Sequence, residues 1–316
     1  MRRIKKKYIF LSLVLAGVAT LCIVRWHAWF DMPAEPEWTG PTRDYVFPMY
    51  ECDNTPQQFD ILVLGDIHNN LTRADYSLLA KRVPQADLVL QTGDWLAWGQ
   101  NYYYQSLLQE WLYSDLYGLP VIATPGNHEY SKGLFKSRSD VWNHAFRYLD
   151  NGPKGVPGAT YYIDLPQIRL IVIDTNPLWR IMHFTRTLTW LHKTMNSASD
   201  RYTVVLMHHP VISAAKGRFN PLIWATFRHA LGSADLVLAG HDHSYMRRTP
   251  FVILNTGGKP KKQRGGLHAQ VTDTVPVYGV LSVKPSQISN HKSQMELRIF
   301  NLEDGKLIDS LHVSHD

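Results

Sequence analysis

Cysteine is scarce in this sequence, which has only two, Cys22 and Cys52, among 316 residues. Cys22 lies in an apolar segment near the start of the chain, so Cys52 has no partner for a disulfide in the remainder. A small domain held together by disulfides is therefore excluded. Stability must come from a large core and from any bound metal, and 45% hydrophobic residues against 19% charged residues are sufficient for such a core.

The net positive charge is also small once the first seven residues are set aside. The net charge is +6, and five of these charges belong to Arg2, Arg3, Lys5, Lys6 and Lys7. The rest of the chain is almost neutral, so it offers no basic surface for a polyanion, and we do not expect nucleic acid as a partner.

An apolar run of seventeen residues without a charge, Tyr8 to Val24, follows these cations. As a helix it would extend about 26 Å, enough to cross a bilayer core of about 30 Å with local thinning. We expect residues 8–24 to form a transmembrane signal anchor. The positive-inside rule then makes residues 1–7 a basic cytoplasmic tail and places everything after Val24 outside the cytoplasm, in the periplasm or the extracellular space.

The alternative for this segment is a cleaved signal peptide, which would give a soluble secreted protein. Such peptides have a shorter apolar core and end in a small-x-small cleavage site. The end of this run, Cys22-Ile23-Val24-Arg25, lacks that pattern. The sequence therefore favours an uncleaved, single-pass anchor.

Residues 25–58 are rich in proline and polar residues and lack periodicity, which indicates a juxtamembrane linker. From Phe59 onward, short apolar runs alternate with segments of helical character, which predicts an α/β layered fold. The expected strands are 60–64, 88–91, 121–124, 170–173, 203–207 and 236–239, and the expected helices are 72–82, 103–113, 140–148, 188–195 and 222–231. Three more apolar runs, 276–283, 294–300 and 307–313, predict a β-meander that completes a sheet edge. We expect one domain over residues 59–316.

Residues of the types that commonly bind metals come immediately after five of the expected strands. They are Asp66 and His68, then Asp94, then Asn127 and His128, then His208 and His209, and finally His241 and His243. Ligands of open α/β sheets gather at the carboxyl ends of the strands, so these side chains are expected in one cleft. A single His or Asp at a strand end is usually a cap, but five such blocks in order indicate a metal site.

The mixture of residue types suits a pair of divalent cations. Two cations about 3.5–4 Å apart can bridge a hydroxide and clamp a phosphoryl oxygen. A carboxylate is the natural bridge between them, and imidazole and carboxamide groups complete each coordination sphere without excess negative charge. The mixed nitrogen and oxygen ligands favour Mn²⁺, Zn²⁺ or Fe²⁺.

The ordered motifs D-x-H, G-D, G-N-H-E, H-H-P and G-H-D-H resemble those of the calcineurin-like metallophosphoesterase superfamily, over roughly residues 60–260. The H-H-P-V and G-H-D-H-S-Y stretches are most similar to the branch of purple and tartrate-resistant acid phosphatases. This resemblance implies a four-layer αββα sandwich of two facing mixed sheets. It also implies a first metal on Asp66, His68, Asp94 and His243, and a second metal on Asp94, Asn127, His208 and His241.

The resemblance further implies that His128 contacts the phosphate and acts as the general acid toward the leaving group. One position departs from the family pattern. Ala97 stands where purple acid phosphatases have a metal-binding Tyr and where other relatives have an Asp that supports the catalytic His. A ferric charge-transfer site is therefore not expected, and His128 must either find another orienting partner or act less strongly as an acid.

Four further residues near these motifs are not counted among the metal ligands. We expect His209 to pack or hydrogen-bond behind His208, Asp242 to point away from the metals, and Asp174 to stabilise a turn. Glu129 could orient a neighbour of the site or lie on the surface.

The predicted function is that of a membrane-anchored hydrolase of phosphate esters, in which a hydroxide between two metals attacks phosphorus. A phosphomonoester is the favoured substrate. The first alternative is a phosphodiesterase or pyrophosphatase that acts on a lipid-linked or nucleotide substrate, and the second is a metal-binding domain without turnover. The expected partners are a phosphorylated small molecule or lipid-linked substrate, and the membrane through residues 8–24.

Overall fold

The computed structural model describes most of the chain after residue 57. The described residues are 58–98, 106–107, 110–130, 142, 146, 148–156, 159–179, 181–198, 201–213, 215, 221–263, 269–284 and 294–313. The expected basic tail, the anchor and all but the last residue of the linker lie outside these ranges. No helix within the described ranges has the length and apolar character needed to span a bilayer.

The first sheet has six strands, in the order β13-β12-β11-β1-β2-β3. Its parallel part consists of β1 (Phe59–Leu64), β2 (Ala86–Gln91) and β3 (Val121–Ala123). The antiparallel part is β11 (Val277–Lys284), β12 (Gln294–Asn301) and β13 (Leu307–Val313), and β11 pairs with β1. The predicted meander is therefore confirmed, and it forms one side of this mixed sheet.

The second sheet has seven strands, in the order β10-β8-β9-β7-β6-β5-β4. Its parallel centre is β5 (Ile168–Ile173), β6 (Tyr202–Met207), β7 (Leu236–Ala239) and β9 (Phe251–Ile253). The strands β4 (Tyr161–Asp164), β8 (Tyr245–Arg248) and β10 (Val271–Asp273) run antiparallel to their neighbours. The sequence did not indicate β4, β8, β9 or β10.

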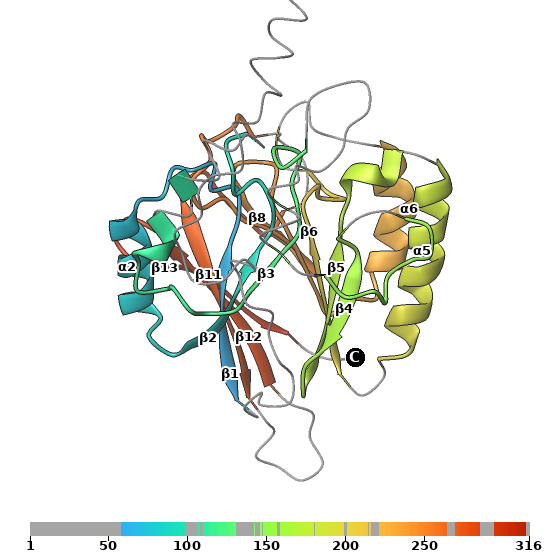
Figure 1. Ribbon diagram of the computed structural model, residues 1–316, viewed down its shortest axis with the longest axis horizontal. Helices are drawn as coiled ribbons and strands as arrows, with labels where there is room; N and C mark the ends of the chain where they lie inside the picture. The colour runs from blue at the N-terminus through green and yellow to red at the C-terminus, as the bar shows by residue number, and fades with distance from the viewer. Residues whose placement is uncertain are drawn as a thin grey trace, which may run out of the picture.

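Successive side chains of a strand point to opposite faces of its sheet, so each sheet packs against a hydrophobic cluster on both faces. In β1, Ile61 and Val63 pack into a cluster shared by both sheets, whereas Leu62 and Leu64 face the helical side. A third cluster joins the seven-stranded sheet to its helices. The two facing mixed sheets of the predicted fold are thus confirmed, with helices on their outer faces (Figure 1).

The helix α2 (Arg73–Arg82) covers the six-stranded sheet, and α5 (Ile181–Asn196) and α6 (Pro221–Leu231) cover the other (Figure 1). A capping box begins α2, since the Thr72 hydroxyl and the Asp75 carboxylate each accept a main-chain N–H of the other residue. A 3-10 turn, η2 (Asn176–Trp179), follows β5.

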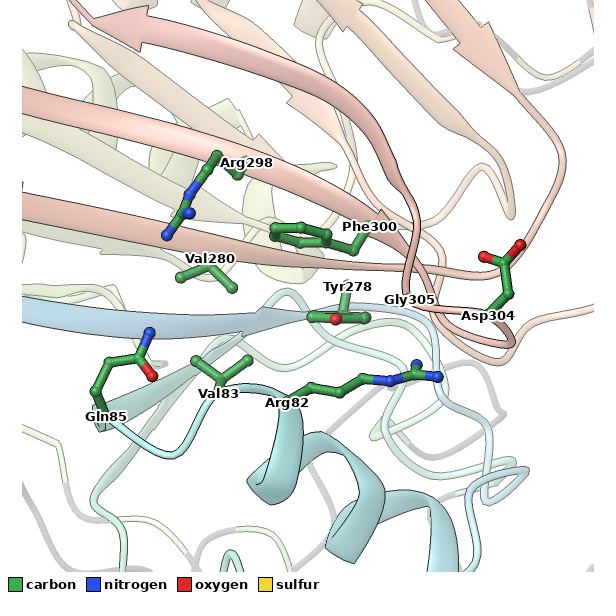
Figure 2. A pocket seen from close by; sticks show the side chains of 9 residues that line it. All are labelled: Arg82, Val83, Gln85, Tyr278, Val280, Arg298, Phe300, Asp304 and Gly305. Carbon is green, nitrogen blue, oxygen red and sulfur yellow. The ribbon is translucent and has the colours of Figure 1, made fainter.

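A pocket of about 320 Å³ lies between the end of α2 and the outer face of β11 and β12 (Figure 2). Arg82 lines this pocket, and its guanidinium donates hydrogen bonds to the carbonyls of Leu302 and Glu303, which ties α2 to the turn after β12. None of the predicted metal ligands lines this pocket. The candidate functional site lies at the carboxyl ends of the parallel strands instead.

Candidate metal centre

The turns after β1, β2 and β7 hold the predicted ligands in an unusual backbone conformation. Asp66, His68, Asp94, His241 and His243 have positive φ angles of 47°, 53°, 53°, 73° and 51°. The left-handed region costs a residue with a side chain about 1–2 kcal/mol. Such strain persists where the surrounding structure requires it, and it is typical of functional sites.

The first group of ligands is formed by Asp66, His68, Asp94 and His243, whose ligand atoms all lie within 4.8 Å of one another. His68 Nε2 lies 3.1 Å from His243 Nε2 and 3.7 Å from Asp94 Oδ2. His243 Nδ1 lies 2.9 Å from the Lys259 carbonyl, which can only accept a hydrogen bond. The neutral His243 ring therefore turns its Nε2 lone pair toward this group.

The second group lies around the buried His208. Its Nε2 is 3.3 Å from Asp94 Oδ2, 3.2 Å from His241 Nδ1 and 3.3 Å from Asn127 Oδ1. Its Nδ1 lies 2.9 Å from the Thr92 carbonyl, so the neutral ring again directs a lone pair at the centre. The structure thus brings all seven predicted ligands to the shared end of the two sheets.

Asp94 stands between the two groups. Its Oδ2 faces His68 on one side and His208 on the other, while its Oδ1 accepts the His128 main-chain N–H at 2.9 Å. Only 1% of the residue is exposed. Asp94 therefore occupies the position that a carboxylate bridging two cations requires.

Two carboxylate oxygens in this centre have no hydrogen-bond donor in the described part of the chain when His208 is neutral. They are Asp66 Oδ2 and Asp94 Oδ2, and both are buried. A buried carboxylate oxygen without a donor is costly, and native proteins normally satisfy such groups. Divalent cations would satisfy both oxygens and would use the imidazole lone pairs that converge on them, so the residues present fit a pair of metals.

In the metal-free protein, burial and the close approach of the carboxylates and imidazoles shift the pKa values of the ligand residues. Burial raises the pKa of Asp66 to about 8, and burial lowers the pKa of His68 to about 3. Burial opposes charge on Asp94 and His208 as well, but their mutual attraction prevails. It holds the pKa of Asp94 well below its ordinary value and raises that of His208 to about 9. Bound cations would replace a protonated His208 as the partner of Asp94.

His128 lies beside the two groups without belonging to either. Its ring packs edge-on against His68, with ring centroids 4.6 Å apart, and lies tilted by 34° against the Trp98 ring, with centroids 4.8 Å apart. Its Nε2 is 3.9 Å from Asp94 Oδ2, so it faces the centre. Its Nδ1 hydrogen-bonds the main-chain carbonyl of Ala97. The orienting partner that the sequence left open is therefore a main-chain group.

A profile of the calcineurin-like phosphoesterase family matches residues 59–245, more than half of the chain. The chain belongs to this family. Comparison of the sequence with proteins of curated function gave no significant match.

Solved structures with the same fold include two whose names are informative. One is GAP50, the anchor in the inner membrane complex of Plasmodium, with a TM-score of 0.58 and 12% identity over 82% of this chain and 89% of that chain. Another is a purple acid phosphatase from yellow lupin (Lupinus luteus) seeds, with a TM-score of 0.59 and 13% identity over 81% of this chain. The match spans 54% of the lupin chain. At these identities the likeness shows the fold alone.

In this calcineurin-like phosphoesterase, the side chain of Glu129 is buried and orients the main chain of the site. Its carboxylate accepts three main-chain N–H groups, from Asp94 at 2.9 Å, Leu96 at 2.9 Å and Gly126 at 2.6 Å. Burial raises the pKa of Glu129 to about 8, and the charge of Asp94 adds to the shift. Of the two roles that the sequence left open for Glu129, the structure shows the orienting one.

Asp242 and Asp174 have the expected structural roles. The Asp242 carboxylate accepts hydrogen bonds from the Ser213 hydroxyl at 3.0 Å and the Ala215 N–H at 3.2 Å, away from the ligand groups. Asp174 stabilises the turn after β5 by accepting the Asn176 N–H at 3.0 Å.

His209 is closer to the phosphoesterase centre than the sequence suggested. Its Nδ1 hydrogen-bonds the Thr175 hydroxyl at 2.6 Å, as expected for a packing role. However, its ring centroid is 4.4 Å from that of His241, and His208, His209 and His241 form a second cluster able to hold a metal. The repeated His in H-H-P was the only sequence signal for this position.

Proposed function

We propose that this chain is a metal-dependent hydrolase of phosphate esters. The first cation would be held by Asp66, His68, Asp94 and His243, and the second by Asp94, Asn127, His208 and His241. The observation that carries the proposal is Asp94 Oδ2, which is buried, has no hydrogen-bond donor among the described residues when His208 is neutral, and lies between the two groups.

Divalent cations bound there would lower the pKa of water to provide a nucleophile near neutral pH, and would offset the charge of the phosphoryl oxygens. The mixed nitrogen and oxygen donors suit Mn²⁺, Zn²⁺ or Fe²⁺. Ala97 offers no phenolate, so the ferric charge-transfer chemistry of purple acid phosphatases is not part of the proposal.

His128 would act on the leaving group. With Nδ1–H donated to the Ala97 carbonyl, an imidazolium His128 carries its second proton on Nε2, which faces the centre. When the bond from phosphorus to the leaving oxygen breaks, the electron pair stays on that oxygen and the Nε2 proton moves to it. His128 is then neutral with its remaining proton on Nδ1. General acids of this kind contribute about 10²- to 10⁴-fold to a rate.

Phosphomonoesters are the proposed substrates, because the H-H-P-V and G-H-D-H-S-Y motifs are most similar to those of acid phosphatases. A phosphodiesterase or pyrophosphatase activity on a lipid-linked or nucleotide substrate is the alternative, favoured by the apolar segment at residues 8–24. Comparison of p-nitrophenyl phosphate with bis(p-nitrophenyl) phosphate separates the two.

A binding role without turnover is the other alternative, since a protein named as an anchor in a membrane complex has this fold. The converging ligands around Asp94 favour an enzyme. Bound metal without hydrolysis of any phosphoester in a panel would support the binding role.

The proposed location is the outer side of a membrane, with residues 8–24 as the anchor and residues 1–7 in the cytoplasm. Intact cells or spheroplasts should leave residues 59–316 accessible to an added protease. N-terminal sequencing should find residues 8–24 retained, and their removal would instead indicate a secreted protein.

The metal proposal predicts the effect of Asp94→Asn. The purified wild type should contain about two cations per chain and hydrolyse p-nitrophenyl phosphate. Because Asp94 would contact both cations, Asp94→Asn should lose metal and lower kcat/KM at least about a hundredfold. Metal analysis and steady-state kinetics measure these effects.

Asp304→Asn is the matched control, because Asp304 is exposed on the turn after β12 and should leave both quantities unchanged. Full turnover in Asp94→Asn, or a wild type that binds no metal, would contradict the proposal.

A further inference from the structure

The turns after β1 and β2 run side by side and are joined by main-chain hydrogen bonds. The His68 N–H donates to the Asp94 carbonyl at 2.9 Å, and the Asn69 N–H donates to the Trp95 carbonyl at 3.0 Å. Beyond this pair the main-chain ladder is continued by a side chain, because the Asn69 Oδ1 accepts the Ala97 N–H at 2.7 Å. Asn69 therefore fixes the place of Ala97 relative to the first ligand turn.

Ala97 connects Asn69 to His128. Its N–H is held by the Asn69 side chain, and its carbonyl is the hydrogen-bond partner of His128 Nδ1. The methyl group of Ala97 can make neither contact, so the position of the carbonyl depends on the hydrogen bonds of the main chain. A change at Asn69 would be transmitted to the His128 ring through one residue.

We propose that Asn69 is a positioning residue, which holds the Ala97 carbonyl against His128 Nδ1 and so directs His128 Nε2 at the leaving group. This inference rests on the general-acid role proposed above for His128. Asn69 itself contacts neither the leaving group nor the metals in this scheme.

The residue type fits this task for two reasons. Asn69 has a φ of 57°, in the left-handed region that Asn adopts more readily than most residues. Its short side chain also ends in an acceptor that reaches a neighbouring main-chain N–H. Glycine would tolerate the same φ without providing the acceptor. The variant Asn69→Gly therefore removes the hydrogen bond while sparing the backbone conformation.

Orientation of an acid matters only where the leaving group needs a proton. p-Nitrophenolate is stable as an anion and leaves with little help, whereas an alkoxide must be protonated as it leaves. A misplaced His128 should therefore slow an alkyl phosphate much more than p-nitrophenyl phosphate. A purely structural defect, such as partial unfolding, would lower both rates by the same factor.

The experiment compares four full-length proteins, namely wild type, Asn69→Gly, Asn70→Gly and His128→Ala, on p-nitrophenyl phosphate and on a simple alkyl phosphate. Asn70 is the matched control, because it is adjacent and its amide donates to the Gly257 carbonyl at 2.7 Å rather than to Ala97. We expect Asn69→Gly to lower kcat/KM for the alkyl phosphate about tenfold more than for p-nitrophenyl phosphate. Asn70→Gly should change both equally, and His128→Ala should show the largest difference.

A second readout does not depend on turnover. The ¹⁵N spectrum of the His128 ring in the metal-free protein should show the Nδ1–H tautomer in wild type and in Asn70→Gly. It should show a mixture of tautomers in Asn69→Gly, because the carbonyl no longer selects one nitrogen.

The outcomes separate the two proposals. If His128→Ala affects both substrates equally, the general-acid role is wrong, and the tautomer spectra alone then decide whether Asn69 holds the ring. If His128→Ala discriminates between the substrates while Asn69→Gly does not, or if the tautomer is unchanged in Asn69→Gly, the positioning role of Asn69 is overturned.

Discussion

Glu129 shows how a single buried side chain can shape a site whose ligands lie elsewhere. Its two carboxylate oxygens accept the N–H groups of Asp94, Leu96 and Gly126, which belong to two different turns. A carboxylate can accept at both oxygens, whereas an amide presents a donor at one of its two ends. The identity of Glu129 is therefore tied to the geometry of the turns that carry Asp94 and Asn127.

Glu129→Gln should destabilise the protein and weaken metal binding. The new amide would place N–H against N–H in at least one of the three contacts, at a cost of about 2 kcal/mol in the free energy of unfolding. Urea unfolding of the metal-free proteins at pH 9, where Glu129 with its pKa of about 8 is ionised, and metal titration measure the two effects. Glu303→Gln, an exposed change of the same type, should alter neither. Wild-type stability in Glu129→Gln would show that the three N–H groups do not need a carboxylate.

The ligand residues could be identified from the sequence because each follows an apolar run that ends in a turn. Asp66 and His243 were identifiable in this way. The partner of His128 was not, because it is the carbonyl of Ala97, and every residue has a carbonyl. Likewise, nothing in the sequence distinguishes a buried Glu129 from an exposed one, since its burial depends on turns that come together only in the fold.

At the scale of the element, strands that form an apolar run directly before a ligand motif were predictable whatever their length. The runs at 60–64 and 203–207 match β1 and β6 closely, because five of the six residues of β1 and all six of β6 are buried and leave a clear apolar signal. The short β3 and β7 were predicted as well, whereas β9, which has three residues like β3, was not. The start of α5 was missed because its first two residues, Ile181 and Met182, are apolar but 67% and 61% exposed, so they do not follow the alternation of a buried and an exposed face.

The turn between β3 and Asn127 lies very close to the turn that carries Asp94. Gly126 lies against Asp94, and a methyl group added to Gly126 would collide with both the carboxylate and the main-chain nitrogen of Asp94. Its own N–H donates to Glu129. Glycine is thus required here for space, because the two turns could not otherwise bring Asp94 and Asn127 together.

Gly126→Ala should therefore displace Asp94 and abolish binding of the metal pair, with a loss of about 1–3 kcal/mol in stability. Metal stoichiometry and urea unfolding are the measurements. Gly118→Ala is the control, because Gly118 has a φ of 95° but no described residue lies within 4 Å of the added carbon. It should cost about 1 kcal/mol through its backbone and retain both metals. Metal content at the wild-type level in Gly126→Ala would contradict the argument.

At the scale of the whole molecule, the described strands after residue 245 are part of the fold rather than an appendage. The family match ends at residue 245, yet β11 pairs with the central β1 over five residues, Val63 lying opposite Gly279. The sequence predicted the meander, but it could not show which strand the meander joins. That pairing links residues more than two hundred positions apart and depends on the complete core between the sheets.

Polar contacts between β13 and β8 join the last strand of the six-stranded sheet to the seven-stranded sheet. Asp309 of β13 accepts hydrogen bonds from the Tyr245 hydroxyl at 2.6 Å and from the Arg247 guanidinium, both on β8. Burial would raise the pKa of Asp309, but the hydrogen bonds from Arg247 and Tyr245 prevail and hold it below its ordinary value. A carboxylate with a lowered folded pKa stabilises the fold above its unfolded pKa of about 3.9, and this contribution disappears as the pH falls through the folded value.

Asp309→Asn should accordingly reduce the free energy of unfolding of the metal-free protein by about 2 kcal/mol at pH 7. The side chains of Asp309 and Arg247 are only 9% and 15% exposed, so solvent screens the lost interaction weakly. The difference from wild type should narrow as the pH falls below about 4, because wild-type Asp309 then becomes neutral as well. Urea unfolding at several pH values measures this, with Asp304→Asn, in an exposed pair with Lys306, as the control. A difference that stays constant down to pH 2 would mean that Asp309 fastens β13 by shape rather than by charge.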